Sequence, residues 1–141
     1  AGGNDNDRYV FGSAADHDLV TEELDGGTDT LDFSAVALDL AVTWSTSLSI
    51  QFTDGLGVQH SVTHSSEQIE RWVGGSGHDS VTVWPSATTA FEFDGGGGTD
   101  TLSYVTGGGP AVAAPEGIAM AGFQMVTTER IESVTLIEDV P

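Results

Sequence analysis

Two nine-residue segments of the chain follow one strict pattern, G-G-x-G-x-D-x-U-x, in which U is a large apolar residue. They are residues 74–82 (GGSGHDSVT) and residues 95–103 (GGGGTDTLS). The glycines permit positive φ angles in a tight turn, so that peptide carbonyls can point inward beside the aspartate. The apolar residue then begins a strand and faces the core. Two matches 21 residues apart predict a repeated unit of one turn followed by one strand.

Two degenerate copies accompany this pair. Residues 2–10 (GGNDNDRYV) carry Asp5 where the pattern expects its third glycine, and Asp and Asn tolerate left-handed backbone geometry better than most residues. Residues 24–32 (LDGGTDTLD) keep the second glycine pair, the aspartate and the apolar residue. The chain therefore contains four related turns.

The spacing of these turns predicts the fold class. They start at residues 2, 24, 74 and 95, which gives intervals of 22, 50 and 21 residues, and the long interval divides into two of about 25. We predict an all-β fold, a right-handed parallel β-solenoid (β-helix or β-roll) of about six coils with Gly/Asp-rich calcium-binding turns. Coils of this length exceed the ~18 residues of two nonapeptides, which favours a three-sided helix over a flat roll.

The sequence also contains a longer repeat that includes these turns. Residues 2–73 and residues 74–135 each run through a nonapeptide, a GGTDTL segment and a Glu-Arg segment in the same order. We therefore expect one domain over residues 1–141, built from two fused internal repeats of about 2–73 and 74–135. Because the chain begins inside a motif, we also expect an excised or processed piece of a longer polypeptide, or a subunit completed by a neighbour.

The intervening segments read as strands. Alternating apolar residues before and after residues 53–57 predict a local hairpin that stands out from the solenoid, and residues 65–71 have the pattern of a single helical turn. Glycines and prolines over residues 106–117 predict a surface loop. The three tryptophans and two tyrosines are expected to pack in the core or at corners, with a sugar-binding face as the alternative.

Composition limits the partners of the chain. The 22 acidic residues stand against three arginines, which gives a formal net charge of −19. Such a surface repels nucleic acid and anionic membranes, and no apolar run approaches the ~20 residues of a membrane helix. The chain has no cysteine, so disulfides and Cys-based zinc sites are excluded. Bound divalent ions or adaptation to a saline environment would each account for the charge.

The turns supply the oxygen ligands that calcium prefers. One turn offers too few of the six to eight oxygens that Ca²⁺ requires, but two turns stacked one coil apart can hold an ion between them. Stacking pairs Asp79 with Asp100 and Asp7 with Asp29; the alternative is that these aspartates only cap the turns. The predicted ligands of two or more Ca²⁺ ions are Gly75, Gly77, Asp79, Gly96, Gly98, Asp100, Gly3, Asp5, Asp7, Gly27 and Asp29.

Catalytic patterns are not found. The sequence has no nucleophile elbow, no zinc-protease helix motif and no phosphate-binding loop with its lysine. His60 and His64 lie ~13 Å apart if they share a strand, and we expect all four histidines to be solvated. We therefore predict that the chain is not an enzyme.

Residues 74–83 and 94–104 resemble hemolysin-type calcium-binding repeats, also called RTX repeats. Residues 25–34 are similar to the segment that enters the RTX region of secreted bacterial proteases, and residues 69–79 resemble repeat joints of large bacterial surface proteins and adhesins. The resemblance implies an extracellular or cell-surface β-solenoid that folds on meeting calcium outside the cell. The chain departs from the usual arrays because its nonapeptides are isolated rather than continuous.

Three functions compete on this basis. The first is an extracellular calcium-binding structural or adhesion module. The second is a module, accessory or catalytic, of a secreted carbohydrate-active enzyme, and the third is a self-assembling filament subunit. Calcium is the expected partner in each case, with other copies of the chain end to end or a surface glycan as further possibilities.

Overall fold

The computed structural model describes residues 4–14, 16–22, 27–45, 47–54, 56–64, 69–84, 91–106, 111–114, 117–120 and 123–137. Every secondary-structure element in these ranges is a β-strand, which confirms the all-β prediction. Within the same ranges, no helix is long and apolar enough to cross a membrane.

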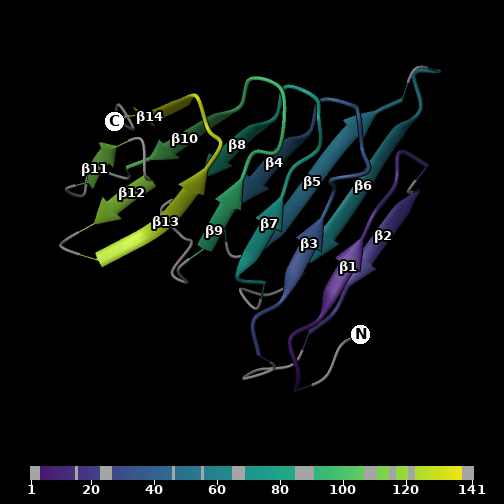
Figure 1. Ribbon diagram of the computed structural model, residues 1–141, viewed down its shortest axis with the longest axis horizontal. Coiled ribbons are helices and arrows are strands. Elements are labelled where there is room, and N and C mark those ends of the chain that lie inside the picture. Colours follow the sequence, from purple (N-terminus) through teal and green to yellow (C-terminus); the bar gives the residue numbers. More distant parts are fainter. Residues whose placement is uncertain are drawn as a thin grey trace.

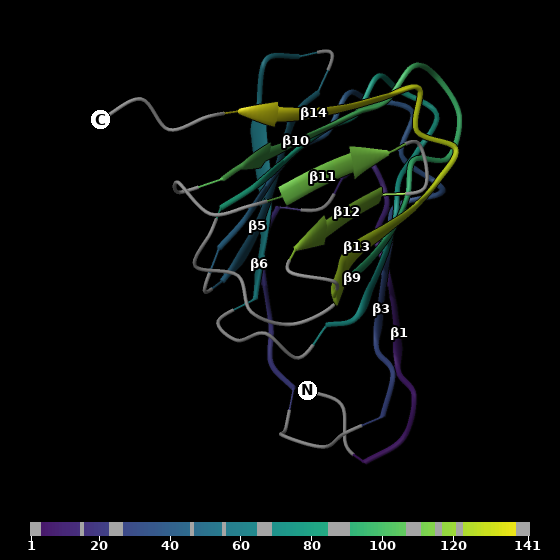
Figure 2. The ribbon, with the colours of Figure 1, turned by 90° about the vertical axis from the view of Figure 1, so that its left-hand side faces the viewer.

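The strands form two seven-stranded sheets that lie face to face (Figures 1 and 2). In sheet A the order is β1 (Arg8–Val10), β3 (Thr30–Asp32), β7 (Arg71–Val73), β9 (Phe91–Asp94), β13 (Phe123–Glu129), β12 (Gly117–Met120) and β11 (Ala111–Ala114). In sheet B the order is β14 (Ser133–Ile137), β10 (Thr101–Val105), β8 (Ser80–Val83), β4 (Ala41–Trp44), β5 (Leu48–Thr53), β6 (Gln59–His64) and β2 (His17–Val20).

The chain crosses between the sheets in the manner of a roll. Five strand pairs pass from sheet A to sheet B in the described residues, namely β1–β2, β3–β4, β7–β8, β9–β10 and β13–β14. Neighbouring strands of successive pairs are parallel, as where Arg8 is opposite Thr30 and Ser80 is opposite Thr101. This is the stacking that the nonapeptide spacing predicts.

The prediction of a uniformly parallel solenoid of about six coils is met only in part. Strand β5 is antiparallel to its neighbours β4 and β6, and β12 is antiparallel to its neighbours β11 and β13, so both sheets are mixed. The described strands also occupy two sheets rather than the three sides we favoured. The extra residues of the long coils form these added hairpin strands instead of a third side.

The predicted hairpin exists but does not stand out from the fold. Strands β5 and β6 pair from Leu48 opposite His64 to Thr53 opposite Gln59, and they form part of sheet B between β4 and β2. Their inward positions are buried because alternate residues of a strand point to one face. The expected loop over residues 106–117 likewise contains strand β11 and the start of β12, whereas most of the expected helical turn at 65–71 lies outside the described residues.

Apolar side chains between the sheets make one core. Trp72 and Phe93 stack with ring centroids 4.1 Å apart, and Trp44 lies 4.6 Å from Phe91. Burying one large apolar side chain contributes roughly 1.5 to 3 kcal/mol, so the sandwich needs no disulfide. Trp44, Trp72 and Tyr104 are thus core residues, as expected, while Trp84 is exposed.

Candidate metal centre

The two complete nonapeptides form stacked turns at one edge of the molecule. Residues 74–79 connect β7 to β8, and residues 95–100 connect β9 to β10. The Asp79 amide donates to Asp100 Oδ1 over 2.7 Å, so the two predicted ligands are neighbours. Both residues are only 1% exposed.

The glycines allow the turns to approach closely. Gly96 and Gly98 have φ angles of +87° and +112°, which residues with side chains rarely adopt. A Cβ at Gly96 would collide with the carbonyl oxygen of Gly75, and one at Gly98 would collide with that of Gly77. Backbone carbonyl oxygens therefore line the contact between the turns.

A third acidic residue extends this row. The Asp100 amide donates to Glu132 Oε2 over 2.6 Å, and the Leu40 amide donates to Asp79 Oδ1 over 2.9 Å. We call Asp79, Asp100 and Glu132 the second acidic ladder. In each of these contacts, a carboxylate oxygen of one turn accepts a hydrogen bond from the backbone amide of the equivalent residue in the turn before it.

The incomplete nonapeptides make a matching row at the opposite edge. The Asp7 amide donates to Asp29 Oδ1 and the Asp29 amide donates to Glu70 Oε2, each over 2.8 Å. We call Asp7, Asp29 and Glu70 the first acidic ladder. These turns lead into strands of sheet A, whereas the turns of the second ladder lead into sheet B.

Glu22 adds a carboxylate to the first ladder. One ligand oxygen each from Asp7, Glu22 and Asp29 lie within 4.8 Å of one another, and the Tyr9 hydroxyl donates to Glu22 Oε1. Gly27, with φ +115°, packs against the Asp5 carbonyl, so this turn keeps the tight contact seen at Gly98. Asp5 itself is exposed, and Gly3 lies outside the described residues.

The buried carboxylates of the second ladder are electrostatically unfavourable without a cation. Burial raises the pKa of Asp79 to about 6, with the nearby Asp100 charge adding to the rise. Burial also raises the pKa of Asp100, helped by the charge of Glu132. At the first ladder, burial raises the pKa of Glu70, and the charge of Asp29 contributes.

The donor set fits calcium. Asp100 Oδ2 is buried without a hydrogen-bond partner among the described residues, and carboxylates and carbonyls are the hard oxygen ligands that Ca²⁺ prefers. A cation beside this oxygen would offset the cost of burying two ionised carboxylates. The same turns contain no nitrogen-rich or sulfur ligand set that would favour zinc.

Two other acidic residues, at the ends of strands β3 and β9, are held by arginines. Arg130 binds Asp94 through Nε–Oδ1 and Nη2–Oδ2 contacts of 2.7 and 2.5 Å, and Arg8 pairs with Asp32. Both aspartates are buried. Burial raises the pKa of Asp32, but hydrogen bonds from Ser34 and Arg8 outweigh it and leave the pKa lowered.

The histidines divide into two groups, and the expectation that all four are solvated is wrong. His17 and His78 are exposed, whereas His60 and His64 are buried on the inner face of β6. His60 stacks on Phe52 and lies 3.3 Å from Asp54, measured from Nε2 to Oδ2. His78 Nδ1 accepts the Thr99 amide over 2.8 Å, as Asn6 Oδ1 accepts the Thr28 amide.

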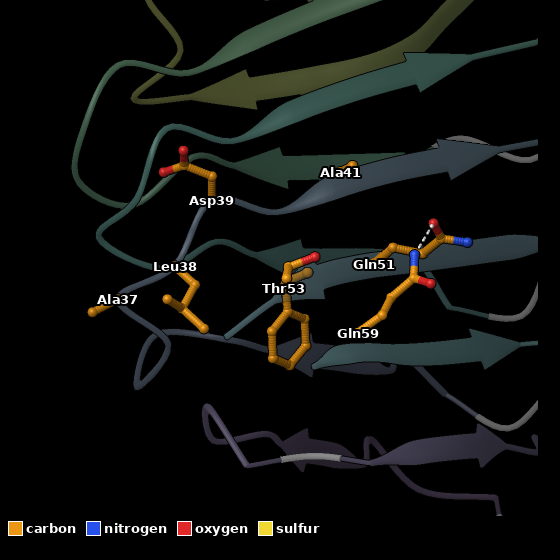
Figure 3. A pocket seen from close by; sticks show the side chains of 8 residues that line it. Ala37, Leu38, Asp39, Ala41, Gln51, Thr53 and Gln59 are labelled. Carbon is orange, nitrogen blue, oxygen red and sulfur yellow. Dashed lines mark hydrogen bonds between the residues drawn. The ribbon is translucent and has the colours of Figure 1, made fainter. Parts of the chain in front are cut away.

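An open pocket of about 500 Å³ lies beside the residues that connect β3 to β4 (Figure 3). Asp39 is the one carboxylate among its lining residues, and Gln59 Nε2 donates to Gln51 Oε1 over 3.2 Å between the neighbouring strands β5 and β6. Asp39 Oδ1 already accepts the His78 amide over 2.7 Å. The pocket therefore lacks the several carboxylates that the ladders bring together.

Comparison with known proteins agrees with this geometry. The model of the family described as peptidase M10 serralysin C-terminal matches residues 2–135, which is nearly the whole chain. The chain matches none of the curated proteins and none of the solved structures with which it was compared.

Proposed function

Because the chain belongs to the serralysin C-terminal family, the RTX calcium-binding repeat domain of secreted bacterial proteins, we propose that it is an extracellular module whose folding is driven by calcium. Members of the family bind calcium and form the non-catalytic C-terminal region of serralysin-type proteins. The observation that carries the proposal is the buried carboxylate pair of Asp79 and Asp100 between stacked glycine turns.

We assign at least one ion to each acidic ladder. At the second ladder the proposed ligands are Asp79 and Asp100, with carbonyl oxygens of the turns that contain Gly75, Gly77, Gly96 and Gly98. At the first ladder they are Asp7 and Asp29, joined by Glu22 and by carbonyls around Asp5 and Gly27. Calcium supplies positive charge between like-charged turns, and the turns exist as a site only in the folded chain, so binding and folding are coupled.

The structural or adhesion role is our preferred assignment within this class. A calcium-dependent sandwich suits a spacer or display module on a secreted or surface-bound protein. The carbohydrate-active alternative gains little support, because Trp44, Trp72 and Tyr104 lie in the core and leave Trp84 as the exposed tryptophan of the described chain. The filament alternative is developed in the next subsection.

A calcium titration of thermal unfolding tests the proposal. We expect the melting temperature to rise steeply with calcium and to fall to its starting value with excess chelator. Magnesium should substitute poorly because it requires a smaller and more regular site. The Asp54→Asn variant is the matched control, since Asp54 caps the β5–β6 turn through Leu56 and Val58 amides and lies outside both ladders. A melting curve that calcium leaves unchanged would refute the proposal.

A further inference from the structure

The same order of seven strands occurs twice along the chain. Residues 8–73 supply β1 to β7, with β1-β3-β7 in one sheet and β2-β6-β5-β4 in the other. Residues 80–137 supply β8 to β14, with β8-β10-β14 in one sheet and β9-β13-β12-β11 in the other. Adding seven to each strand number of the first set reproduces the second, with the two sheets interchanged.

The pairing directions follow the same rule. The parallel pairs β1–β3, β3–β7 and β2–β6 correspond to the parallel pairs β8–β10, β10–β14 and β9–β13. The antiparallel pairs β4–β5 and β5–β6 correspond to β11–β12 and β12–β13. The acidic ladders fall at equivalent places, with Asp-Asp-Glu in each set.

Two further strand pairs join the first set of strands, β1 to β7, to the second set, β8 to β14. Strand β4 is parallel to β8, with Ala41 opposite Ser80, and β7 is parallel to β9, with Arg71 opposite Glu92. Trp72 stacks on Phe93 and Arg71 Nε contacts Glu92 Oε1 at 2.7 Å across this junction. Strands β4 and β7 of the first set thus pair with β8 and β9, the first two strands of the second set.

Among the described strands, those that lie outermost at the two ends are the equivalents of the strands that meet at this junction. Strands β1 and β2 are the outer strands at one end of the long axis, and β11 and β14, which correspond to β4 and β7, are outermost at the other (Figure 1). Apolar side chains are exposed at both ends, with Val10 at 64%, Leu19 at 67% and Ile137 at 44%. A depression of about 300 Å³ between β1 and β2 is lined by Tyr9, Val10, Phe11, Asp18, Leu19 and Val20.

We propose that residues 2–73 and 74–137 are two copies of one seven-strand unit, and that β11 and β14 of one molecule receive β1 and β2 of a second copy as β4 and β7 receive β8 and β9. Both sheets then continue from one molecule into the next with parallel pairing. This inference deepens the proposed function, because it rests on the ladder turns being folded in calcium. The net charge of −19 opposes association, and bound cations reduce that repulsion.

The internal junction also predicts the register of the contact. Thr82 is the ninth residue of its nonapeptide and is opposite Thr43, the third residue of β4. Val10 is the ninth residue of the equivalent nonapeptide, and Ala113 is the third residue of β11. Val10 of one copy should therefore lie opposite Ala113 of the other.

Cross-linking between two single-cysteine variants tests this register, because the natural chain has no cysteine. Val10→Cys, labelled with a heavy isotope, is mixed in calcium with unlabelled Ala113→Cys and treated with a short bismaleimide. We expect a heterodimer yield several-fold above that of Val10→Cys mixed with Leu56→Cys, since Leu56 is exposed at the far β5–β6 turn. Equal yields for the two mixtures would overturn the proposal.

Sedimentation velocity gives an independent check. Association should increase with protein concentration in calcium, fall strongly for Val10→Lys, and persist for Val10→Thr, which introduces the residue of the internal junction. A concentration-independent monomer that calcium still stabilises would refute end-to-end docking and leave the calcium module intact. Loss of calcium stabilisation itself would instead refute the proposed function.

Discussion

The first and second acidic ladders share a three-rung plan but differ in how their turns are built. In the second ladder, Gly96 and Gly98 let the carbonyl oxygens of the preceding turn approach closely, and Asp79 and Asp100 are almost completely buried. In the first ladder, Asp5 replaces a glycine, Asp7 is half-buried, and Glu22 joins from outside the motif. Asp29 is as deeply buried as Asp79 and Asp100, so the ladders differ at their first rung, where Asp7 is more open than Asp79 and has Glu22 beside it. We therefore expect the second ladder to depend more on a bound cation.

The largest expected difference between the ladders is in calcium-dependent stability. We expect Asp100→Asn to reduce calcium affinity about a hundredfold, which corresponds to about 2.7 kcal/mol of lost stabilisation near saturation. Asp7→Asn should have a smaller effect, since Glu22 and Asp29 remain beside it. Calcium titration of thermal unfolding in both variants measures the two losses. Equal losses would remove the distinction between the ladders.

The same asparagine substitution should act in the opposite direction without calcium. Replacing a buried carboxylate by an amide removes a charge that burial disfavours, so calcium-free Asp100→Asn should unfold at a temperature no lower than the natural chain. Thermal unfolding in excess chelator provides the measurement. A calcium-free variant that is clearly less stable would show that Asp100 acts mainly as a turn cap.

The second ladder should make both the free energy of unfolding and the calcium affinity depend on pH. The pKa of Asp79 is about 6 in the calcium-free folded chain, against 3.8 for an ordinary aspartate. The folded state therefore binds this proton more tightly, so the free energy of unfolding without calcium should fall as the pH rises from about 4 to about 6 and then level off. Calcium needs the ionised carboxylate, so its affinity should weaken as the pH falls through about 6.

Calorimetric titration with calcium between about pH 5 and pH 8 measures this effect. Asp79→Asn should make the calcium affinity of the second ladder nearly independent of pH. Asp54→Asn should leave the dependence of calcium affinity on pH unchanged. A calcium affinity that is constant across the range would contradict the assignment of Asp79 as a ligand.

Glycine-to-alanine substitutions should also destabilise the two ladders to different extents, but this difference is expected to be smaller. Gly98→Ala should cost roughly 1 to 3 kcal/mol, because its φ of +112° is strained for alanine and its Cβ would strike the Gly77 carbonyl. Gly27→Ala should cost somewhat less, because one of its contacts is the movable Asn6 side chain. Gly12→Ala is the control, since no atom lies within 4 Å of the added carbon. Denaturant unfolding in calcium would rank the three, and a neutral Gly98→Ala would contradict the stacking.

The smallest expected effect concerns the fifth position of the motif. His78 Nδ1 and Asn6 Oδ1 each accept the amide of the next turn, so His78→Asn should preserve stability while His78→Ala should lose about 1 kcal/mol. Thermal unfolding of the two variants distinguishes them. If both behave alike, the hydrogen bond contributes nothing measurable.

Local parts of this account could be predicted from the sequence. The nonapeptides gave the pairing of Asp79 with Asp100 and of Asp7 with Asp29 because turns one coil apart must stack. The alternation around residues 53–57 predicted the hairpin for a similar reason, since strand periodicity is a local property. The calcium ligands themselves remain a proposal.

Longer-range features could not be predicted in this way. The two ladders lie at opposite edges because β4, β5 and β6 stay in sheet B, and the spacing does not reveal how often residues 33–73 cross between sheets. Glu70 and Glu132 were missed as third rungs, although each directly precedes a strand as the motif aspartates do. His60 and His64 follow the apolar alternation of β6, and giving that pattern more weight than their polarity would have placed them inside.

A crystal structure grown in calcium, with anomalous scattering used to locate the ions, tests the central claim most directly. The account predicts one ion in contact with Asp79 or Asp100 between residues 74–79 and 95–100, and another in contact with Asp7 or Asp29. Ions confined to sites outside the ladders, such as Asp54, with both ladders held only by their amide hydrogen bonds, would contradict it.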